Sequence, residues 1–237
     1  YWNRCYDPWR MERDTKIKSI LAERDIRVES HNGSLLWEPW DIKKDDGTPY
    51  KVFTPFYRKG CLNASAPRKP LKAPKDVSWL QDQETILSPD GLDLRPEFKW
   101  DEMLAPHWTI GEEGAHDRLR DFIGTGLAHY KEGRNLPAKP FVSRLSPHLR
   151  FGEISPNQAW YAATSQGDGK DIDHFCSELG WREFSYSLLY HNPDLAVVNL
   201  QKKFNEFPWS SNPAALTAWQ KGKTGVPMVD AGMRELW

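Results

Sequence analysis

Four side chains near residue 180 have the spacing of one helix face and could do chemistry together. At i, i+3, i+4 and i+7 they are Glu178, Trp181, Arg182 and Ser185. A carboxylate, an indole and a guanidinium on one face of a helix can line a binding pocket. The same pattern also fits an exposed i,i+4 ion pair of Glu178 with Arg182, which contributes roughly 0.2–0.5 kcal/mol. The spacing alone leaves both interpretations open.

Residues 141–148 form a second candidate site. Two hydroxyls and a guanidinium, those of Ser143, Ser146 and Arg144, stand there in a segment bounded by prolines. Such groups can hold a phosphate through side-chain and backbone donors. Serine and proline are also common where a loop enters a helix, so an ordinary capped loop explains the segment as well.

Tryptophan is unusually frequent, with 12 copies against 10 phenylalanines and 8 tyrosines. Among those in the second half of the chain are Trp181, Trp209, Trp219 and Trp237. Large rings usually fill the core. The functional alternative is a stacking surface or a relay of oxidisable rings.

Several other kinds of site are excluded by their motifs. Gly222-Lys223-Thr224 resembles the end of a phosphate-binding P-loop, but Thr217 stands where that motif requires glycine. We expect Gly222 to end a helix instead. The 3 cysteines contain no CxxC pair and the 7 histidines no HExxH motif, so neither a disulfide framework nor a metal site is predicted. This use of cysteine is typical of a reducing, cytoplasmic setting.

Residues 1–58 have the pattern of an α/β domain. The end of a strand at Tyr1-Trp2 is followed by a helix near Pro8 and by β-prone residues at 26–28. Apolar residues then alternate over 50–54 and close this part. Because a parallel sheet repeats strand–helix–strand units several times, we expect a larger Rossmann-like domain whose beginning is missing here.

The second half is predicted to be helical. An apolar stripe over residues 112–133 indicates one helix, and a second runs from about Asp173 to His191. A last helix opens at Pro227 and reaches the end of the chain without a cap, so we interpret the chain as a fragment. N-cap residues followed by proline indicate two further helix starts, Ser155-Pro156 and Asn212-Pro213.

Composition fits a globular protein and sets limits on its partners. The 237 residues include 32 Lys+Arg and 33 Asp+Glu, a net charge of -1, so no overall electrostatic attraction to nucleic acid is indicated. Hydrophobic residues at 39% can build a core. No apolar stretch approaches the roughly 18 residues that a membrane span needs. Residues 59–110, rich in Pro, Lys and Asp, are predicted to connect two domains.

Six segments occur in the order in which one known family has them: 2–14, 50–56, 143–155, 178–184, 209–213 and 222–234. Through them the chain resembles the photolyase/cryptochrome family of flavoproteins, and most of all its class I cyclobutane pyrimidine dimer photolyases. The resemblance implies an α/β plus all-α fold. Residues 1–58 would be a partial antenna domain, 59–110 an interdomain linker, and 111–237 the first half of a helical FAD-binding domain.

The resemblance also implies FAD as the cofactor. The matching flavin-contacting positions are Tyr130, Val142, Ser143, Arg144, Leu145, Ser146, Glu178, Trp181 and Arg182. Val142 departs from the family, which has threonine there. A second antenna chromophore of folate or deazaflavin type is left unassigned, because Trp9 and Arg10 stand where folate-type members carry Asn and Glu.

UV-damaged DNA is the partner that the resemblance implies. The matching DNA-contacting residues are Arg134, Glu178, Trp181, Arg182 and Ser185. In the family the carboxylate bonds the damaged pyrimidine pair and the indole packs on it, while Trp209 matches the exposed end of an electron-transfer chain. Glu178 would stabilise the reduced lesion only by donating a proton or hydrogen bond, which requires a buried, protonated carboxyl.

The expected function is light-dependent repair of cyclobutane pyrimidine dimers by electron transfer from FAD, a lyase reaction. The first alternative is a cryptochrome, a blue-light receptor without repair activity. An enzyme for (6-4) lesions and a plain helical interaction module are the remaining ones. We expect a monomer with neither metal nor membrane partner. Because half of the flavin pocket would be missing, we expect these 237 residues alone to be inactive and to bind FAD poorly.

Overall fold

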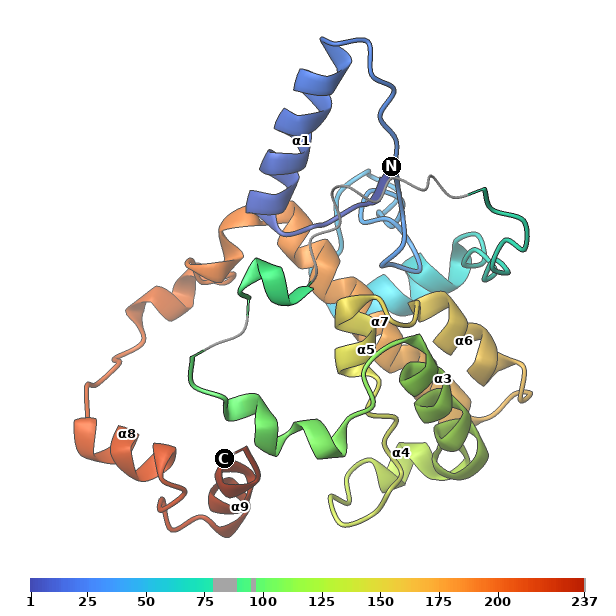
Figure 1. Ribbon diagram of the computed structural model, residues 1–237. Coiled ribbons are helices and arrows are strands. Elements are labelled where there is room, and N and C mark those ends of the chain that lie inside the picture. The colour runs from blue at the N-terminus through green and yellow to red at the C-terminus, as the bar shows by residue number, and fades with distance from the viewer. Residues whose placement is uncertain (79–88, 95–96, 237) are drawn as a thin grey trace. The chain divides into compact units, whose positions relative to one another are not determined.

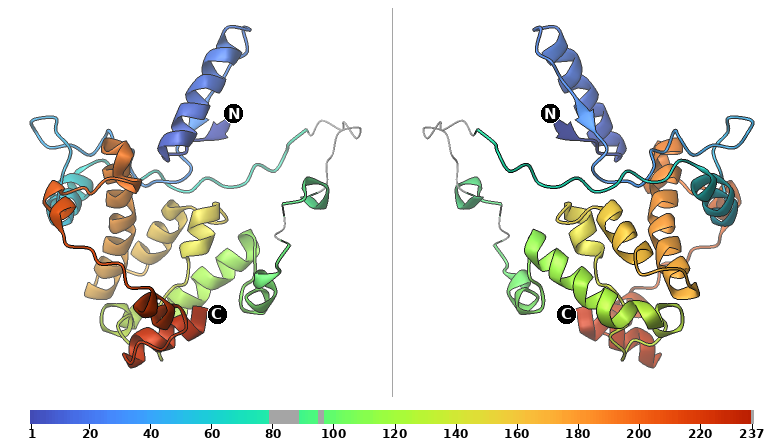
Figure 2. Two further views of the ribbon diagram at one scale, coloured as in Figure 1. Left: turned by 90° about the vertical axis from the view of Figure 1, so that its left-hand side faces the viewer. Right: turned by 90° about the vertical axis from the view of Figure 1, so that its right-hand side faces the viewer.

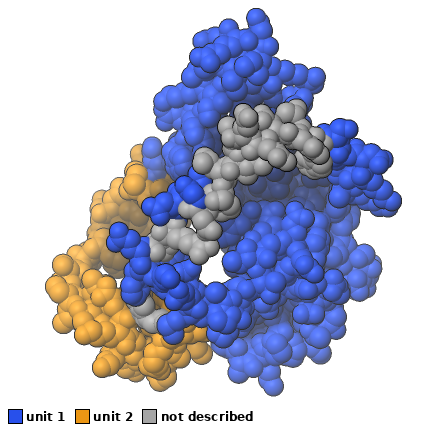
Figure 3. Space-filling view, viewed as in Figure 1, with its two compact units in different colours: residues 1–194 blue, residues 195–237 orange. Residues whose placement is uncertain are grey.

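The computed structural model describes residues 1–78, 89–94 and 97–236. They form two compact units, residues 1–194 and residues 195–237 (Figure 3). The three-part division expected from the sequence, at residues 58 and 110, stays a prediction. Among the described residues, no helix is long and apolar enough to cross a membrane.

A strand–helix–strand unit opens the chain, as the sequence predicts (Figure 1). Strand β1 (Trp2–Asn3) pairs in parallel with β2 (Ser30–His31), and α1 (Pro8–Ala22) connects them. The second strand does not lie at residues 26–28, where it was predicted. Asp25 takes the left-handed φ of 57°, and Ile26 donates its N–H to Leu21 O at 3.0 Å. Ile26 therefore still closes the end of α1, and the strand begins only after it.

The alternating residues 50–54 do not form a strand, although alternation is the strand period. Instead α2 (Phe53–Pro55) runs into a π-helical turn, η1 (Phe56–Gly60), and a 3-10 turn, η2 (Cys61–Asn63). The helical backbone turns the rings of Phe56 and Tyr57 inward, where both are buried. Packing of these rings thus overrides the local pattern.

The helical region of unit 1 begins with α3 (Glu112–Asp121), which continues through a π-turn η6 (Phe122–Gly126) and a 3-10 turn η7 (Leu127–His129) into α4 (Tyr130–Gly133). The predicted apolar stripe is confirmed. Its buried members are Ala115, Leu119, Phe122, Leu127 and Tyr130.

Three further helices complete unit 1: α5 (Ser146–Phe151), α6 (Pro156–Thr164) and α7 (Lys170–His191). Helix α6 has the predicted cap, in which Ser155 and Gln158 form a reciprocal capping box. Helix α7, orange in Figures 1 and 2, packs against α4, α6 and η1.

The predicted connector is partly tied to this unit. Within its described residues it contains only short turns: the end of η1, η2, η3 (Pro89–Leu92), η4 (Trp100–Met103) and η5 (Ala105–His107). Its first part is held by side chains of unit 1 that donate to its backbone: Trp37 Nε1 to Ser65 O at 2.9 Å, and Tyr161 Oη to Pro67 O at 2.5 Å.

Unit 2 contains two 3-10 turns, η8 running into it (Pro193–Ala196) and η9 (Lys202–Glu206), and two helices, α8 (Pro213–Gln220) and α9 (Pro227–Leu236). The predicted Asn212 cap is confirmed, since its side chain accepts from Ala215 N at 3.0 Å. Gly222, with φ 58°, follows α8 as predicted. Trp237, predicted on the last helix, lies outside the described residues.

Candidate functional site

Helix α7 places the predicted site residue Glu178 beside Arg134, the C-cap residue of α4. Glu178 forms an ion pair with Arg134, and His174 Nε2 lies 3.8 Å from Glu178 Oε1. The Glu178 side chain is 33% exposed. The Arg134 guanidinium also lies 6.0 Å from the ring centre of Tyr130. Tyr130, Arg134 and Glu178 are therefore brought together.

Arg182 does not form the i,i+4 ion pair with Glu178 that its spacing allows. Its guanidinium turns to the opposite side and donates to Ser34 O at 2.5 Å and to Glu183 Oε1 at 3.3 Å. Ser185 donates its hydroxyl to Trp181 O at 2.9 Å within the same helix. Of the four side chains that share the spacing, Glu178 and Trp181 are the pair that stays open to a ligand.

Trp181 is half-exposed, with 45% of its surface accessible. One face of the indole is covered by Phe53, whose ring centre lies 3.8 Å away at an interplanar angle of 11°. Phe184 contacts it edge-on at 5.9 Å and 73°. The indole thus presents a flat surface to an incoming planar group.

Of the predicted segment 142–146, Val142, Ser143 and Arg144 border a hollow of about 320 Å³, whereas Leu145 and Ser146 do not line it. Arg144 takes the left-handed φ of 51°, a conformation that costs a non-glycine residue of order 1–3 kcal/mol and persists only where the surroundings enforce it. Val142 is exposed and offers no hydroxyl. Leu145 is buried and precedes Ser146, the first residue of α5.

The polar lining of this hollow fits the diphosphate of a dinucleotide cofactor. Three cationic side chains and two hydroxyls face one carboxylate there: Arg118, Lys139, Arg144, Thr125, Ser143 and Asp121. Excess positive charge with hydroxyl donors is the set that binds phosphate groups. Arg118 and Lys139 were not predicted from the sequence. They come from α3 and from the loop after α4, and no helix or strand period relates their positions to residues 142–146.

Trp209, the residue that matches the exposed end of the electron-transfer chain, lies in unit 2. Its ring is 80% exposed and packs on Phe207 with ring centres 4.7 Å apart. An exposed indole can exchange electrons with solvent, which is the role that the family resemblance implies for it.

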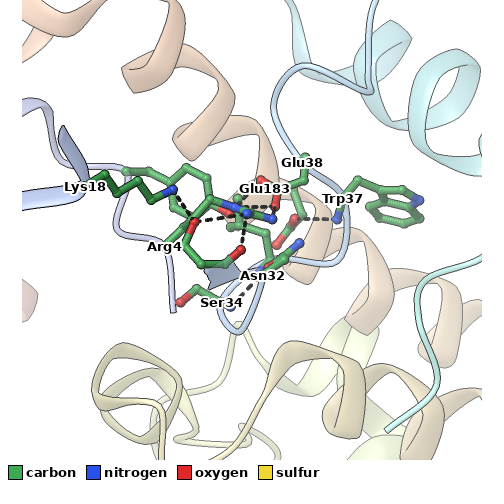
Figure 4. Close-up of polar contacts among 10 residues, drawn as sticks. Arg4, Lys18, Asn32, Ser34, Trp37, Glu38 and Glu183 are labelled. Carbon is green, nitrogen blue, oxygen red and sulfur yellow. Dashed lines mark hydrogen bonds and ion pairs between the residues drawn. The ribbon is translucent and has the colours of Figure 1, made fainter. Parts of the chain in front are cut away.

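A buried carboxylate, Glu183, ties α7 to the N-terminal segment (Figure 4). It accepts the backbone N–H groups of Leu36 at 2.8 Å and Trp37 at 3.2 Å. Burial raises the pKa of Glu183 to about 7, against the opposing effects of Arg182 and the two N–H donors. No role for Glu183 was predicted from the sequence. Its position between Arg182 and Phe184, close to the apolar face of the helix, could have indicated a buried carboxylate.

A second hollow of about 210 Å³ lies between β1, α1 and the end of α7. Aromatic and cationic side chains line it, among them Trp2, Trp40, Tyr190, Arg4 and Lys18. Trp9 and Arg10 are not part of it, since Arg10 instead lies over the exposed ring of Trp9 at 5.0 Å. The described residues contain no group of three or more side chains arranged to bind a metal ion.

Two family patterns match the chain. The pattern described as "DNA photolyase" covers residues 1–75, and "FAD binding domain of DNA photolyase" covers residues 175–237. The deoxyribodipyrimidine photo-lyase of Agrobacterium fabrum is 41% identical over 100% of this chain and 50% of its own length. Cryptochrome-1 of Arabidopsis thaliana is 30% identical over 100% of this chain and 36% of its own.

Solved structures agree with the sequence matches. A bacterial class III photolyase from Agrobacterium tumefaciens superposes with a TM-score of 0.92 at 41% identity, over 100% of this chain and 50% of that one. A cryptochrome from Synechocystis gives a TM-score of 0.75 at 26% identity, over 100% and 50%. This chain belongs to the DNA photolyase/cryptochrome family and contains part of its FAD-binding domain. It spans about half the length of the photolyases that it matches.

Proposed function

We propose that this protein is a light-dependent DNA photolyase that splits cyclobutane pyrimidine dimers with FAD as its cofactor. The observation that carries the proposal is the grouping on α7 of a half-exposed, ring-backed Trp181 and a Glu178 paired with Arg134. A flat ring, a carboxylate and a guanidinium side by side suit a pyrimidine dimer that has left the duplex, together with its phosphate. The high similarity to a class III photolyase supports that branch over the class I assignment expected from the sequence.

The residues of the chain would hold and orient, while the cofactor supplies the redox chemistry. When bound, FAD would supply the light-driven one-electron chemistry that splits the dimer. Arg118, Lys139 and Arg144 would bind its diphosphate. Val142 would replace a hydroxyl contact of the family by an apolar one.

Lesion binding requires that the dimer leave the duplex, which costs a few kcal/mol and less for a poorly stacked, damaged base. Stacking on Trp181 would offset this cost by roughly 1–3 kcal/mol per base. Arg134 would contact the backbone phosphate, and Glu178 would accept a hydrogen bond from the base. A buried, protonated carboxyl would donate a hydrogen bond to the lesion instead. Glu178 is one-third exposed and ion-paired, so we assign it the role of hydrogen-bond acceptor.

The decisive experiment uses the complete gene product and an oligonucleotide with one thymine cyclobutane dimer, under blue light and in the dark. Light-dependent recovery of thymines is expected, and a matched oligonucleotide with a (6-4) lesion tests the choice of lesion. Flavin binding without repair of either would favour the cryptochrome alternative, which is supported by matches that cover all of this chain and 36% and 41% of two plant cryptochromes. Absence of flavin would contradict both.

The hollow beside Trp2 and Trp40 is our candidate for a second chromophore. An archaeal photolyase from Sulfolobus tokodaii, solved with two FAD molecules, superposes with a TM-score of 0.69 at 27% identity over 99% of this chain and 48% of that one. Chromatography of the pigments released from the purified protein would identify a folate, deazaflavin or flavin.

We also propose a cytoplasmic monomer; gel filtration with light scattering measures its mass.

A further inference from the structure

We propose that Phe53 is a positioning residue for Trp181: it fixes the plane of the indole so that the free face receives the lesion. The inference rests on the proposed function, because it concerns how the same site recognises a damaged base. Phe53 comes from the N-terminal part of the chain and has no contact with cofactor or DNA assigned to it.

Three rings form one row of nearly parallel planes. Tyr57 and Phe53 stack with centres 5.6 Å apart at 9°, and Phe53 and Trp181 with centres 3.8 Å apart at 11°. Exposure increases along the row, from the buried Tyr57 through the partly buried Phe53 to the 45% exposed Trp181. The row therefore ends in an indole whose outer side is open, and a pyrimidine ring would add the next layer.

Among the rings of the described residues, only Phe53 stacks face to face on the indole of Trp181. Phe184 meets it edge-on, at 73°, which limits sliding but leaves the ring free to tilt. A half-exposed side chain that can tilt must lose that freedom when a base stacks on it. Phe53 removes the freedom beforehand, because tilting the indole would break the parallel contact at 3.8 Å.

The contact depends on a close approach of two helical segments. Gly180, next to Trp181, lies against the ring of Tyr57, and a Cβ at Gly180 would collide with that ring. Without a side chain there, α7 can approach α2 and η1 closely enough for Phe53 to reach the indole. The row of rings is thus built by the packing of the N-terminal part against α7.

The test compares variants of the complete, flavin-loaded gene product in their affinity for two oligonucleotides, one with a single thymine dimer and one undamaged. Phe53→Leu should weaken binding to the damaged oligonucleotide roughly three- to tenfold, the range of an aromatic pair contact, and leave binding to the undamaged one unchanged. Phe53→Tyr keeps the flat ring and should bind as the wild type does. Phe53→Met, a flexible residue that fills the same space without a ring, should reproduce the loss even if Phe53→Leu fails to fold.

The control is Tyr50→Leu. Tyr50 is another partly buried ring of the same segment, and it packs edge-on against Phe56 at 6.2 Å, away from Trp181. This variant should lose stability without losing discrimination between the two oligonucleotides. Equal losses of discrimination in Tyr50→Leu and Phe53→Leu, or none in either Phe53→Leu or Phe53→Met, would overturn the proposal. A wild-type protein that binds flavin but does not discriminate would overturn the proposed function as well.

Discussion

The two glutamates of α7 have different roles because one is exposed and the other is buried. Glu178 and Glu183 are five residues apart and therefore point to different sides of the helix. Glu178 is one-third exposed and pairs with Arg134, where an incoming ligand can reach it. Glu183 is buried and fully occupied by Leu36 N, Trp37 N and Arg182. The first is suited to recognition and the second to holding the structure together.

Replacing Glu178 by Gln should weaken binding of dimer-containing DNA about tenfold, because a hydrogen bond to a charged group contributes roughly 1.5–3 kcal/mol when it is well shielded and less at a partly exposed site. The flavin content should stay the same. Asp173→Asn, on the exposed part of the same helix, is the matched control and should have no effect. Affinities for damaged and undamaged oligonucleotides measure both, and an unchanged ratio in Glu178→Gln would exclude the recognition role.

Because the pKa of Glu183 is raised, we expect the free energy of unfolding to depend on pH. Its folded-state pKa of about 7 lies above the usual value of 4.5 for a glutamate, so the folded state binds the proton more tightly than the unfolded one. The contribution of this group is complete below about pH 4.5 and is lost as pH rises to about 7. The loss is on the order of 3 kcal/mol, taking about 1.4 kcal/mol per pKa unit.

Urea unfolding at several pH values tests this sign. The free energy of unfolding of the wild type should contain a component that falls between about pH 4.5 and 7, and Glu183→Gln should lack that component. Glu206→Gln, an exposed carboxylate in unit 2, should keep it. Parallel pH curves for the wild type and Glu183→Gln would show that Glu183 does not titrate in this range.

At the scale of elements, α7 and η1 can lie close together because Gly180 has no side chain. Gly180→Ala places a Cβ against the buried Tyr57 ring, so the usual preference of a helix for alanine should be outweighed by a loss of about 1–3 kcal/mol from overpacking. In Gly232→Ala, inside α9, nothing lies near the new Cβ, and stability should rise by up to about 1 kcal/mol. Chemical denaturation would reveal the opposite signs; equal signs would contradict the packing argument.

The elements that local signals specify could be predicted from the sequence, and those set by long-range packing could not. Ser155 and Asn212 begin helices because their side chains cap backbone N–H groups three residues ahead, a purely local interaction. Residues 50–54 have the period of a strand, yet the chain becomes helical from Phe53 on, since Phe56 and Tyr57 pack against a helix far along the chain. Local pattern carries no information about that partner.

The candidate site divides in the same way. The spacing on α7 placed Glu178 and Trp181 on one exposed side, and this part was available from the sequence. The pairing of Glu178 with Arg134, the hollow at Arg118 and Lys139, and the ring behind Trp181 all join residues without a shared periodicity. Such contacts follow from how α3, α4 and α2 pack around α7, which requires the structure.

At the scale of the whole molecule, α7 links recognition to architecture. One side carries the open Glu178 and Trp181, while Arg182 and Glu183 hold Ser34, Leu36 and Trp37 on the other (Figure 4). Backbone donors and acceptors of the N-terminal segment are thereby satisfied by side chains of the helical part. The N-terminal residues that supply Phe53 are consequently part of the same folded unit as the lesion-facing helix.

A polypeptide of residues 1–237 should fold yet retain far less than one FAD per chain. The residues that would hold the cofactor are open to water: Val142 is 42% exposed, and Lys139 and Arg144 are exposed as well. A dinucleotide of this size is normally enclosed over 70–90% of its surface, and the photolyases that this chain matches are about twice as long. The molar ratio of released flavin to protein, measured for this polypeptide and for the complete gene product, gives the comparison. A stoichiometric flavin in the shorter chain would show that the described residues already form a sufficient pocket.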